Sequence, residues 1–279
     1  MRLCSLFLLA MITGAGLAGP RVEAPRGTLI IAGGGKLPPV IDAAFVSAAG
    51  GPGARIAVLP TASGVPKESA QDMVDRFRKL GAVPIVVDPR TRAESEAWGH
   101  RQEAATCTGL WFTGGDQNRI ADLIGDTSLH RLIQSIHQAG GAVGGTSAGA
   151  AIMSKAMFTG QDRHGKDALA EFGPGAYRTR PGLGFLPDGV MVDQHFLRKG
   201  RENRLFSLVM EHPDLLGLGI DEATALVVKD GKASVLGEGL VMVFDPSGMA
   251  IAGPSFQNLR IHALRDGQTI DLATRKVSP

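Results

Sequence analysis

The stretch that decides the fold spans residues 142–153 and reads AVGGTSAGAAIM. It begins with two apolar residues, Ala142 and Val143, continues through glycines, and ends in a run that suits a helix. A short apolar strand that leads through a tight turn into a helix is the unit from which parallel sheets are built. The glycines therefore mark the carboxyl end of a strand, the edge at which ligands collect in such sheets.

Similar apolar runs precede this stretch, and helical patterns separate them. The runs cover residues 28–32, 54–59, 83–87 and 110–112. Apolar residues spaced three and four apart predict helices around residues 70–80, 120–124 and 129–136. Strands that alternate with amphipathic helices predict an α/β fold with a mostly parallel sheet flanked by helices.

The second half of the chain has a different pattern. Residues 158–181 are polar and rich in glycine without a clear period, which predicts a long connection. We expect a hairpin over residues 225–236, with its turn at Asp230-Gly231. The other predicted elements are a strand at 190–196, a helix at 198–211 and β segments at 239–244 and 258–264. They predict a C-terminal β extension. Because no linker divides the chain, we expect residues 27–279 to form a single hydrolytic domain.

The N-terminus resembles a secretory leader. Arg2 precedes an apolar stretch over residues 3–17, and small residues follow at a plausible cleavage point. A membrane anchor is the alternative, but the stretch is shorter than the ~20 residues that a spanning helix needs. We therefore expect residues 1–20 to be a signal peptide, and the mature protein to be secreted or periplasmic and free of the membrane.

Charge and residue spacing exclude several functions. The formal net charge of +2 is small for a nucleic-acid surface. No H-E-x-x-H spacing occurs, and Gly33-Gly34-Gly35 lacks the Lys-Ser/Thr of a phosphate-binding loop. We expect no metal, no cofactor and no nucleic-acid partner. Cys107 is the one cysteine beyond the leader, and we expect it to be buried and inert.

Residues 145–149 match the G-x-S-x-G nucleophile elbow, with Ser147 at its centre. Small residues permit the sharp turn, which lifts the serine hydroxyl above the sheet edge. The backbone N–H of Ala148 then lies at a helix start, where it can stabilise an oxyanion. The alternative is an ordinary glycine-rich turn with a helix-capping serine.

A serine nucleophile needs a base, and His195 is the best candidate because it lies at a predicted strand end within Asp193-Gln194-His195-Phe196. A hydrogen-bonded structural histidine is the alternative. The remaining histidines are His100, His130, His137, His164, His212 and His262. We expect His130 and His137 to lie on the surface of a helix.

The base needs an acid, which fixes its tautomer. Asp193 is only two residues from His195, which does not favour the in-line contact that is required. Asp221 and Glu222 end another predicted strand, and sequence spacing does not separate them.

With these residues assembled, the chain resembles cyanophycinase and related serine peptidases of the aspartyl-dipeptidase type, whose fold is like that of class I glutamine amidotransferases. The resemblance covers about residues 28–245. It rests on FTGGDQ at 112–117, GTSAGA at 145–150, GLGFL at 182–186, DQHF at 193–196 with the Arg-rich helix that follows, and GIDEATAL at 219–226.

The resemblance implies a triad of Ser147, His195 and Glu222, and an oxyanion hole formed by the N–H groups of Gly115 and Ala148. The positions that it implies for substrate binding are Gln117, Asp193, Gln194, Lys199, Arg201 and Arg204. Arginines suit carboxylates of the substrate, and Asp193 suits its guanidinium groups. For isolated basic residues, a solvated helix face is the alternative. Lys199 departs from the family, which usually has arginine there; lysine keeps the charge but loses the bidentate fork.

The expected function is that of an exported serine peptidase that hydrolyses cyanophycin, a poly-aspartate with arginine on its side chains, to β-aspartyl-arginine dipeptides through an acyl-enzyme. One alternative is a related peptidase for aspartyl or isoaspartyl peptides, and the other is a catalytically silent binding protein. The expected partners are a peptide or poly-aspartate-type substrate and, as a further option, a second copy of the chain in a homodimer.

Overall fold

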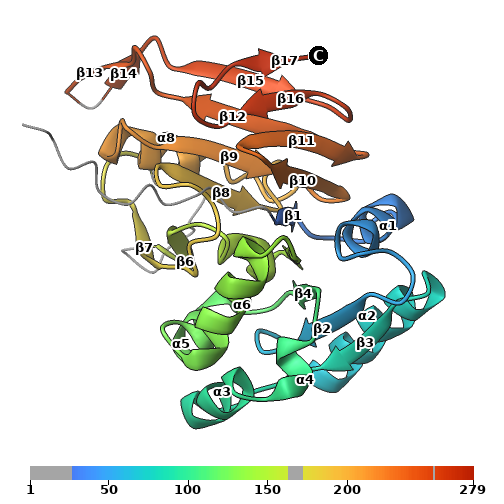
Figure 1. Ribbon diagram of the computed structural model, residues 1–279. Coiled ribbons are helices and arrows are strands. Elements are labelled where there is room, and N and C mark those ends of the chain that lie inside the picture. Colours follow the sequence, from blue (N-terminus) through green and yellow to red (C-terminus); the bar gives the residue numbers. More distant parts are fainter. Residues whose placement is uncertain (1–26, 163–171, 254) are drawn as a thin grey trace, which may run out of the picture.

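The computed structural model describes residues 27–162, 172–253 and 255–279 (Figure 1). Within them, the main sheet has the strand order β17-β16-β11-β10-β1-β5-β4-β2-β3. Its parallel part consists of β1 (Thr28–Ala32), β5 (Ala142–Thr146), β4 (Gly109–Phe112), β2 (Arg55–Leu59) and β3 (Val83–Val86). The prediction of an α/β fold with a mostly parallel sheet is confirmed.

The antiparallel part of this sheet extends it beyond β1. Its strands are β10 (Thr224–Lys229), β11 (Lys232–Gly237), β16 (Thr269–Asp271) and β17 (Val277–Ser278). The hairpin predicted at Asp230-Gly231 joins β10 to β11, and both of its turn residues have positive φ. Asp and Gly suit that conformation, which explains why the turn could be predicted.

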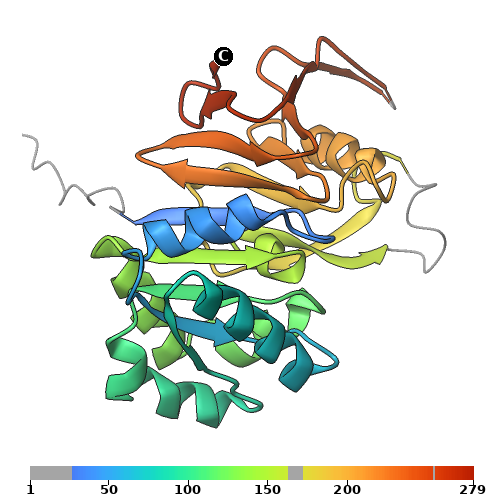
Figure 2. The same cartoon turned by 90° about the vertical axis from the view of Figure 1, so that its right-hand side faces the viewer.

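Helices cover both faces of the parallel part. They are α1 (Pro39–Ala48), α2 (Pro66–Lys79), α3 (Arg92–Gly99), α4 (Gln102–Ala105), α5 (Gln117–Ile124) and α6 (Ser128–Gln138). On one face, Phe45 of α1 packs against Phe77 of α2 at 5.3 Å and against Trp111 of β4 at 4.9 Å between ring centroids. Figure 2 shows α1 in front of the sheet on this face. Apolar side chains of α5 and α6 fill the opposite face.

A second sheet consists of four strands. Its order is β15-β12-β9-β8, with β8 (Val190–Gln194), β9 (Leu216–Ile220), β12 (Val241–Asp245) and β15 (Arg260–Leu264). Strands β8 and β9 are parallel, so their carboxyl ends meet at one edge. Helix α8 (Glu202–Glu211) packs on this sheet. A small hairpin, β13 (Ala250–Ala252) and β14 (Ser255–Gln257), completes the C-terminal β extension.

Two hydrogen bonds join the second sheet to the first at this edge. The backbone N–H of His195, just after β8, donates to the carbonyl of Gly33, just after β1, at 2.8 Å. The N–H of Ala223, between β9 and β10, donates to the carbonyl of Gly34 at 3.0 Å. The ends of β1, β8 and β9 are thereby held together.

Residues 158–181 differ from the prediction of a connection without elements. They contain most of β6 (Ala156–Asp162) and all of β7 (Tyr177–Pro181), which pair in an antiparallel hairpin. Most of β7 is exposed, so its outward residues are polar and no alternating apolar pattern marks the strand. The predicted helix at 198–211 begins only at Glu202, because residues 196–200 form a turn.

The prediction for His130 and His137 was wrong. Both side chains of α6 are buried, at 7% and 4% exposure, and both rings lie 6.0 Å from that of Phe185. Burial lowers the pKa of each imidazole. The prediction treated histidine as a polar surface residue, but a neutral imidazole packs well in a core once its ring nitrogen has a hydrogen-bond partner. For His130 this partner is the carbonyl of Leu183, 2.9 Å from Nε2.

Two further expectations concern single segments. Cys107 is buried, as predicted, and burial raises its pKa to about 11. The predicted signal peptide, residues 1–20, lies outside the described residues. Among the helices of the described ranges, none has the length and apolarity that crossing a bilayer requires.

Candidate active site

Ser147 lies between β5 and the short helix α7 (Ala148–Ala151), with φ 55° and ψ −109°. This strained backbone is the one that a nucleophile elbow requires. The flanking glycines are needed for space. A side-chain carbon on Gly145 would lie 2.8 Å from the backbone of Gly149, and one on Gly149 would lie 2.4 Å from the carbonyl oxygen of Phe112. The G-x-S-x-G pattern is therefore enforced by close backbone packing.

Ser147 begins a hydrogen-bond chain of three side chains. Its Oγ lies 2.8 Å from Nε2 of His195, and Nδ1 of the same ring lies 2.6 Å from Oε1 of Glu222. Strand register explains the meeting, because Ala32 pairs with Thr146 and Gln194 pairs with Ile220. The residues just beyond these strands then converge from three elements.

The pKa shifts of Glu222 and His195 indicate which group donates each of these hydrogen bonds. The hydrogen bond from His195 lowers the pKa of the Glu222 carboxyl, so Glu222 is ionised at neutral pH and accepts a hydrogen bond from the Nδ1–H of His195. Burial lowers the pKa of His195, the bond to Glu222 raises it, and the charges of Lys199 and Arg201 lower it. The imidazole is therefore neutral at pH 7, and its Nε2 accepts the hydroxyl proton of Ser147.

The structure distinguishes Asp221 from Glu222, the two acids between which sequence spacing could not choose. Oδ1 of Asp221 accepts the backbone N–H of Arg198 at 2.9 Å, so this carboxylate stabilises the turn after β8. Glu222 is the residue in contact with His195.

The glycines after β1 form one wall of the site. A side-chain carbon on Gly34 would lie 2.3 Å from Cε1 of His195, and one on Gly35 would lie 2.7 Å from Oε2 of Glu222. The sequence places Gly33-Gly34-Gly35 at a strand end, where ligands collect, and excludes a phosphate loop there. The contacts of these glycines show a backbone wall against which the His195 ring rests. The glycine run itself was the signal for such a close approach.

Gly114, Gly115 and Ala148 lie beside the Ser147 hydroxyl. A side-chain carbon on Gly114 would lie 3.9 Å from Oγ of Ser147. Gly115 has φ +139° and packs against the carbonyl of Ala62, so only glycine fits there. Among the described residues, the N–H groups of Gly115 and Ala148 donate to no other protein group. They are the backbone donors that an oxyanion would need.

A buried charge cluster lies next to the site. Asp193, on β8, is only 1% exposed, and its Oδ2 lies 3.0 Å from Nε of Arg204, while its Oδ1 lies 3.9 Å from Nη1 of Arg201. Burial raises the pKa of Asp193, and the two guanidinium groups oppose this effect. Asp193 thus faces the protein's own arginines rather than open space.

Arg204 does not lie on a solvated helix face, which was the alternative to a role in substrate binding. Its side chain is 6% exposed, and its guanidinium lies 4.5 Å from the ring centroid of Phe158. Arg201 is more open, at 18%, and donates to the backbone carbonyl of Gln194 at 2.6 Å and to the Gln194 side chain. The arginines are therefore held in fixed positions.

The remaining predicted binding residues surround this cluster. Gln117 is buried, and its Nε2 donates to the carbonyl of Phe158 at 2.8 Å. Gln194 is buried beside Arg201. Lys199 is exposed on the turn after β8, where partial desolvation of its ammonium and the charge of Arg201 lower its pKa.

Comparison with known proteins identifies relatives of this chain. Residues 29–236 match the model of peptidase family S51. Cyanophycinases from Synechococcus elongatus and Thermosynechococcus vestitus are each 36% identical to the chain over 249 residues, which is 84% of this chain and 74% of each relative. The cyanophycinase of Geminocystis herdmanii is 35% identical over 246 residues, 83% of this chain and 88% of the relative.

Solved structures share the fold. A peptidase from an acI-B1 actinobacterium superposes with a TM-score of 0.68 at 22% identity, covering 89% of this chain and 98% of that one. A putative peptidase E from Listeria monocytogenes gives a TM-score of 0.51 at 16% identity, covering 76% and 99%. The family match over residues 29–236 and the 36% identical cyanophycinases establish that the chain belongs to peptidase family S51 and is a serine-type peptidase.

Proposed function

We propose that the protein hydrolyses cyanophycin to β-aspartyl-arginine dipeptides, with Ser147 as nucleophile, His195 as base and Glu222 as the acid that orients it. The observation that carries the proposal is the continuous hydrogen-bond chain, 2.8 Å from Ser147 to His195 and 2.6 Å from His195 to Glu222. The relatives named cyanophycinase supply the substrate class.

The chemistry follows from the positions of these groups. Nε2 of His195 takes the hydroxyl proton while Oγ of Ser147 bonds to the scissile carbonyl carbon. The N–H groups of Gly115 and Ala148 stabilise the resulting oxyanion. Collapse of the tetrahedral intermediate breaks the C–N bond, and His195 returns its proton to the leaving amine. Water, deprotonated by His195, then releases the acyl group from Ser147.

The charge cluster supports a substrate that bears carboxylates. Lys199 and Arg201 are the two cations whose charges act on His195, and they would pair with carboxylates of the polymer. Asp193 and Arg204 would act from beneath, because both are buried and paired with each other, and Oδ1 of Asp193 lies 3.9 Å from Nη1 of Arg201. Gln117 and Gln194 would complete the wall of the pocket.

The test is a comparison of substrates. Purified protein should clear insoluble cyanophycin faster than it hydrolyses β-aspartyl dipeptides, and Ser147→Ala should abolish clearing. Ser135→Ala, which removes an exposed hydroxyl on α6, is the matched control and should clear at the wild-type rate. Hydrolysis of β-aspartyl dipeptides without clearing would instead identify a related peptidase for aspartyl or isoaspartyl peptides.

A silent binding protein is the other alternative. It predicts tight polymer binding and no product from wild type. The aligned hydrogen-bond chain argues against it, because a relic site has no need to keep Ser147, His195 and Glu222 in contact.

Export is proposed on the leader alone. Residues 1–20 have the charged start, apolar middle and small residues of a signal peptide, and a secreted or periplasmic protein would meet polymer outside the producing cell. N-terminal sequencing of protein recovered outside the cytoplasm should show a start near residue 20. Recovery of unprocessed Met1 there would contradict the proposal.

A further inference from the structure

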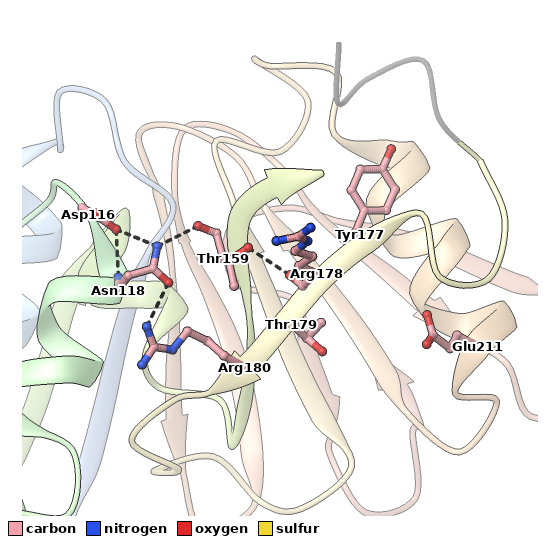
Figure 3. A pocket seen from close by; sticks show the side chains of 8 residues that line it. All are labelled: Asp116, Asn118, Thr159, Tyr177, Arg178, Thr179, Arg180 and Glu211. Atoms are coloured by element: carbon pink, nitrogen blue, oxygen red, sulfur yellow. Dashed lines mark hydrogen bonds between the residues drawn. The ribbon is translucent and has the colours of Figure 1, made fainter. Parts of the chain in front are cut away.

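A polar pocket of about 520 Å³ opens beside the candidate active site (Figure 3). Its walls come from the start of α5, from β6 and β7, and from the end of α8. None of the six residues that the family resemblance implies for substrate binding lines it. The pocket is therefore separate from the charge cluster around Asp193.

The wall between α5 and the β6–β7 hairpin is pinned by side-chain contacts. Nδ2 of Asn118 donates to the carbonyl of Thr159 at 2.9 Å. Nη2 of Arg180 lies 2.5 Å from Oδ1 of Asp122, and its Nη1 reaches Oδ1 of Asn118 at 3.5 Å. These contacts join β7 to α5, so the pocket has a defined shape before any ligand enters.

Arg178 supplies an available positive charge in this pocket. Its side chain projects from β7 among the lining residues in Figure 3, and it is exposed. Within the part of the chain that the structure describes, its guanidinium has no hydrogen bond and no ion pair, whereas the neighbouring Arg180 is paired with Asp122. A guanidinium in this state is suited to bind a carboxylate in bidentate fashion.

Two carboxylates lie in the same pocket and keep one oxygen each available. Asp116 uses Oδ1 to accept the backbone N–H and the side-chain amide of Asn118, both at 2.9 Å. Glu211 uses Oε2 to accept the N–H of Gly175 at 2.8 Å. The other oxygens, Oδ2 and Oε1, accept no bond from the described residues. The pocket thus offers both signs of charge.

The pocket begins close to the candidate nucleophile. Gly114 contacts Ser147, since a side-chain carbon there would lie 3.5 Å from its Cβ. Asp116 is two residues further along, and two residues of chain span at most about 7 Å. A polymer held at Ser147 can therefore extend a neighbouring unit into this pocket.

We propose that this pocket is a second substrate subsite, which binds the aspartyl-arginine unit next to the pair being cleaved. Each such unit carries one free carboxylate and one guanidinium. Arg178 pairs with the carboxylate, and Asp116 and Glu211 receive the guanidinium. The inference rests on the proposed function. It adds that kcat/KM depends on the length of the substrate through the contact with Arg178.

The test compares Arg178→Ala with wild type on cyanophycin oligomers of two and four units. The kcat/KM for the four-unit oligomer should fall at least tenfold, as expected for loss of a charge-assisted contact, while the value for the two-unit oligomer stays within about twofold. Arg265→Ala removes an exposed arginine outside the pocket and should change neither value. Equal losses on both oligomers, or no loss, would overturn the subsite while hydrolysis by wild type upheld the proposed function.

A binding measurement keeps the two proposals separate. If wild type cleaves neither oligomer, the proposed function fails, and the subsite is then judged on the Ser147→Ala background by calorimetric titration with the four-unit oligomer. Adding Arg178→Ala should weaken that binding at least tenfold. Unchanged or undetectable binding on this background would contradict the subsite.

Discussion

The proton on Nδ1 of His195 is the feature on which the proposed chemistry depends. The carboxylate of Glu222 accepts a hydrogen bond from this N–H, with 2.6 Å between Nδ1 and Oε1. The other ring nitrogen, Nε2, is therefore free to accept a hydrogen bond from the hydroxyl of Ser147. An ionised acid at this position fixes the tautomer and stabilises the imidazolium that forms during reaction.

Glu222→Gln should keep the shape of the site but lose most of its rate. An amide can donate to Nδ1 and so favour the wrong tautomer, for which kcat falls by about 10⁴-fold in the best-known serine triad. The acid limb of kcat/KM should also move to lower pH, because the bond to Glu222 raises the pKa of His195. Steady-state kinetics from pH 4 to 9 measure both effects. A variant with wild-type kcat would remove Glu222 from the mechanism.

Lys199→Ala should shift the same limb in the opposite direction. The ammonium of Lys199 lowers the pKa of His195, so its removal raises that pKa and the activity falls off at a higher pH than in wild type. Lys229→Ala, an exposed lysine on β10, is the matched control and should leave the profile unchanged. A shift to lower pH on loss of Lys199 would contradict the assigned electrostatics.

At the scale of elements, strand ends rather than single motifs build the site. The apolar strands and their following glycines could be predicted from sequence, because buried parallel strands read as continuous apolar runs. Strand β7 could not, since most of it is exposed and its polar residues carry no period. Helix α3 was overlooked although its start has a capping box, in which Thr91 and Glu94 bond to each other's backbone N–H.

The candidate site, like the fold, could be predicted from the sequence only in part. The elbow at Ser147 and the strand-end position of His195 were visible in the sequence. Spacing could not choose between Asp221 and Glu222, because only the turn after β8 decides which carboxylate faces the imidazole. The burial of Asp193 was also invisible, since it follows from the packing of α8 on the second sheet.

Gly34→Ala tests the backbone wall at the end of β1. The added carbon would lie 2.3 Å from Cε1 of His195, so the ring must move, and a displacement of about 1 Å costs on the order of 10²-fold in rate. Gly53→Ala is the matched control, because Gly53 also has positive φ but its added carbon meets nothing within 4 Å. Both variants should lose stability in thermal unfolding, and only Gly34→Ala should lose kcat beyond that. Equal activity of the two variants would refute the role of this wall.

At the scale of the whole molecule, one carboxylate joins the C-terminal β extension to the rest. Asp245 on β12 is 2% exposed and pairs with Arg275 at 2.9 Å and with Arg260 at 3.1 Å. Arg275 also donates to the backbone carbonyl of Asp214, ahead of β9. We propose on this basis that residues 27–279 unfold as a single domain.

Asp245→Ala should lower the free energy of unfolding by roughly 2 kcal/mol, because it removes the buried carboxylate that accepts hydrogen bonds from Arg275 and from the backbone N–H of Ser247. Hydrogen bonds from Ser247 and Arg275 outweigh burial and lower the pKa of Asp245, so this stabilisation is present at neutral pH and is lost as pH falls through that lowered pKa. Differential scanning calorimetry should show one transition that shifts as a whole. Asp72→Ala, which removes an exposed partner of Arg76, should change stability by less than about 1 kcal/mol. Two separate transitions would contradict the single domain.

The most direct test of the central proposal is the rate at which wild type and Ser147→Ala release soluble β-aspartyl-arginine from insoluble cyanophycin. We predict steady release by wild type and a loss of at least about 10⁴-fold in a folded Ser147→Ala variant, as for other serine nucleophiles. Release by Ser147→Ala within tenfold of wild type, or no release by wild type, would contradict the proposal.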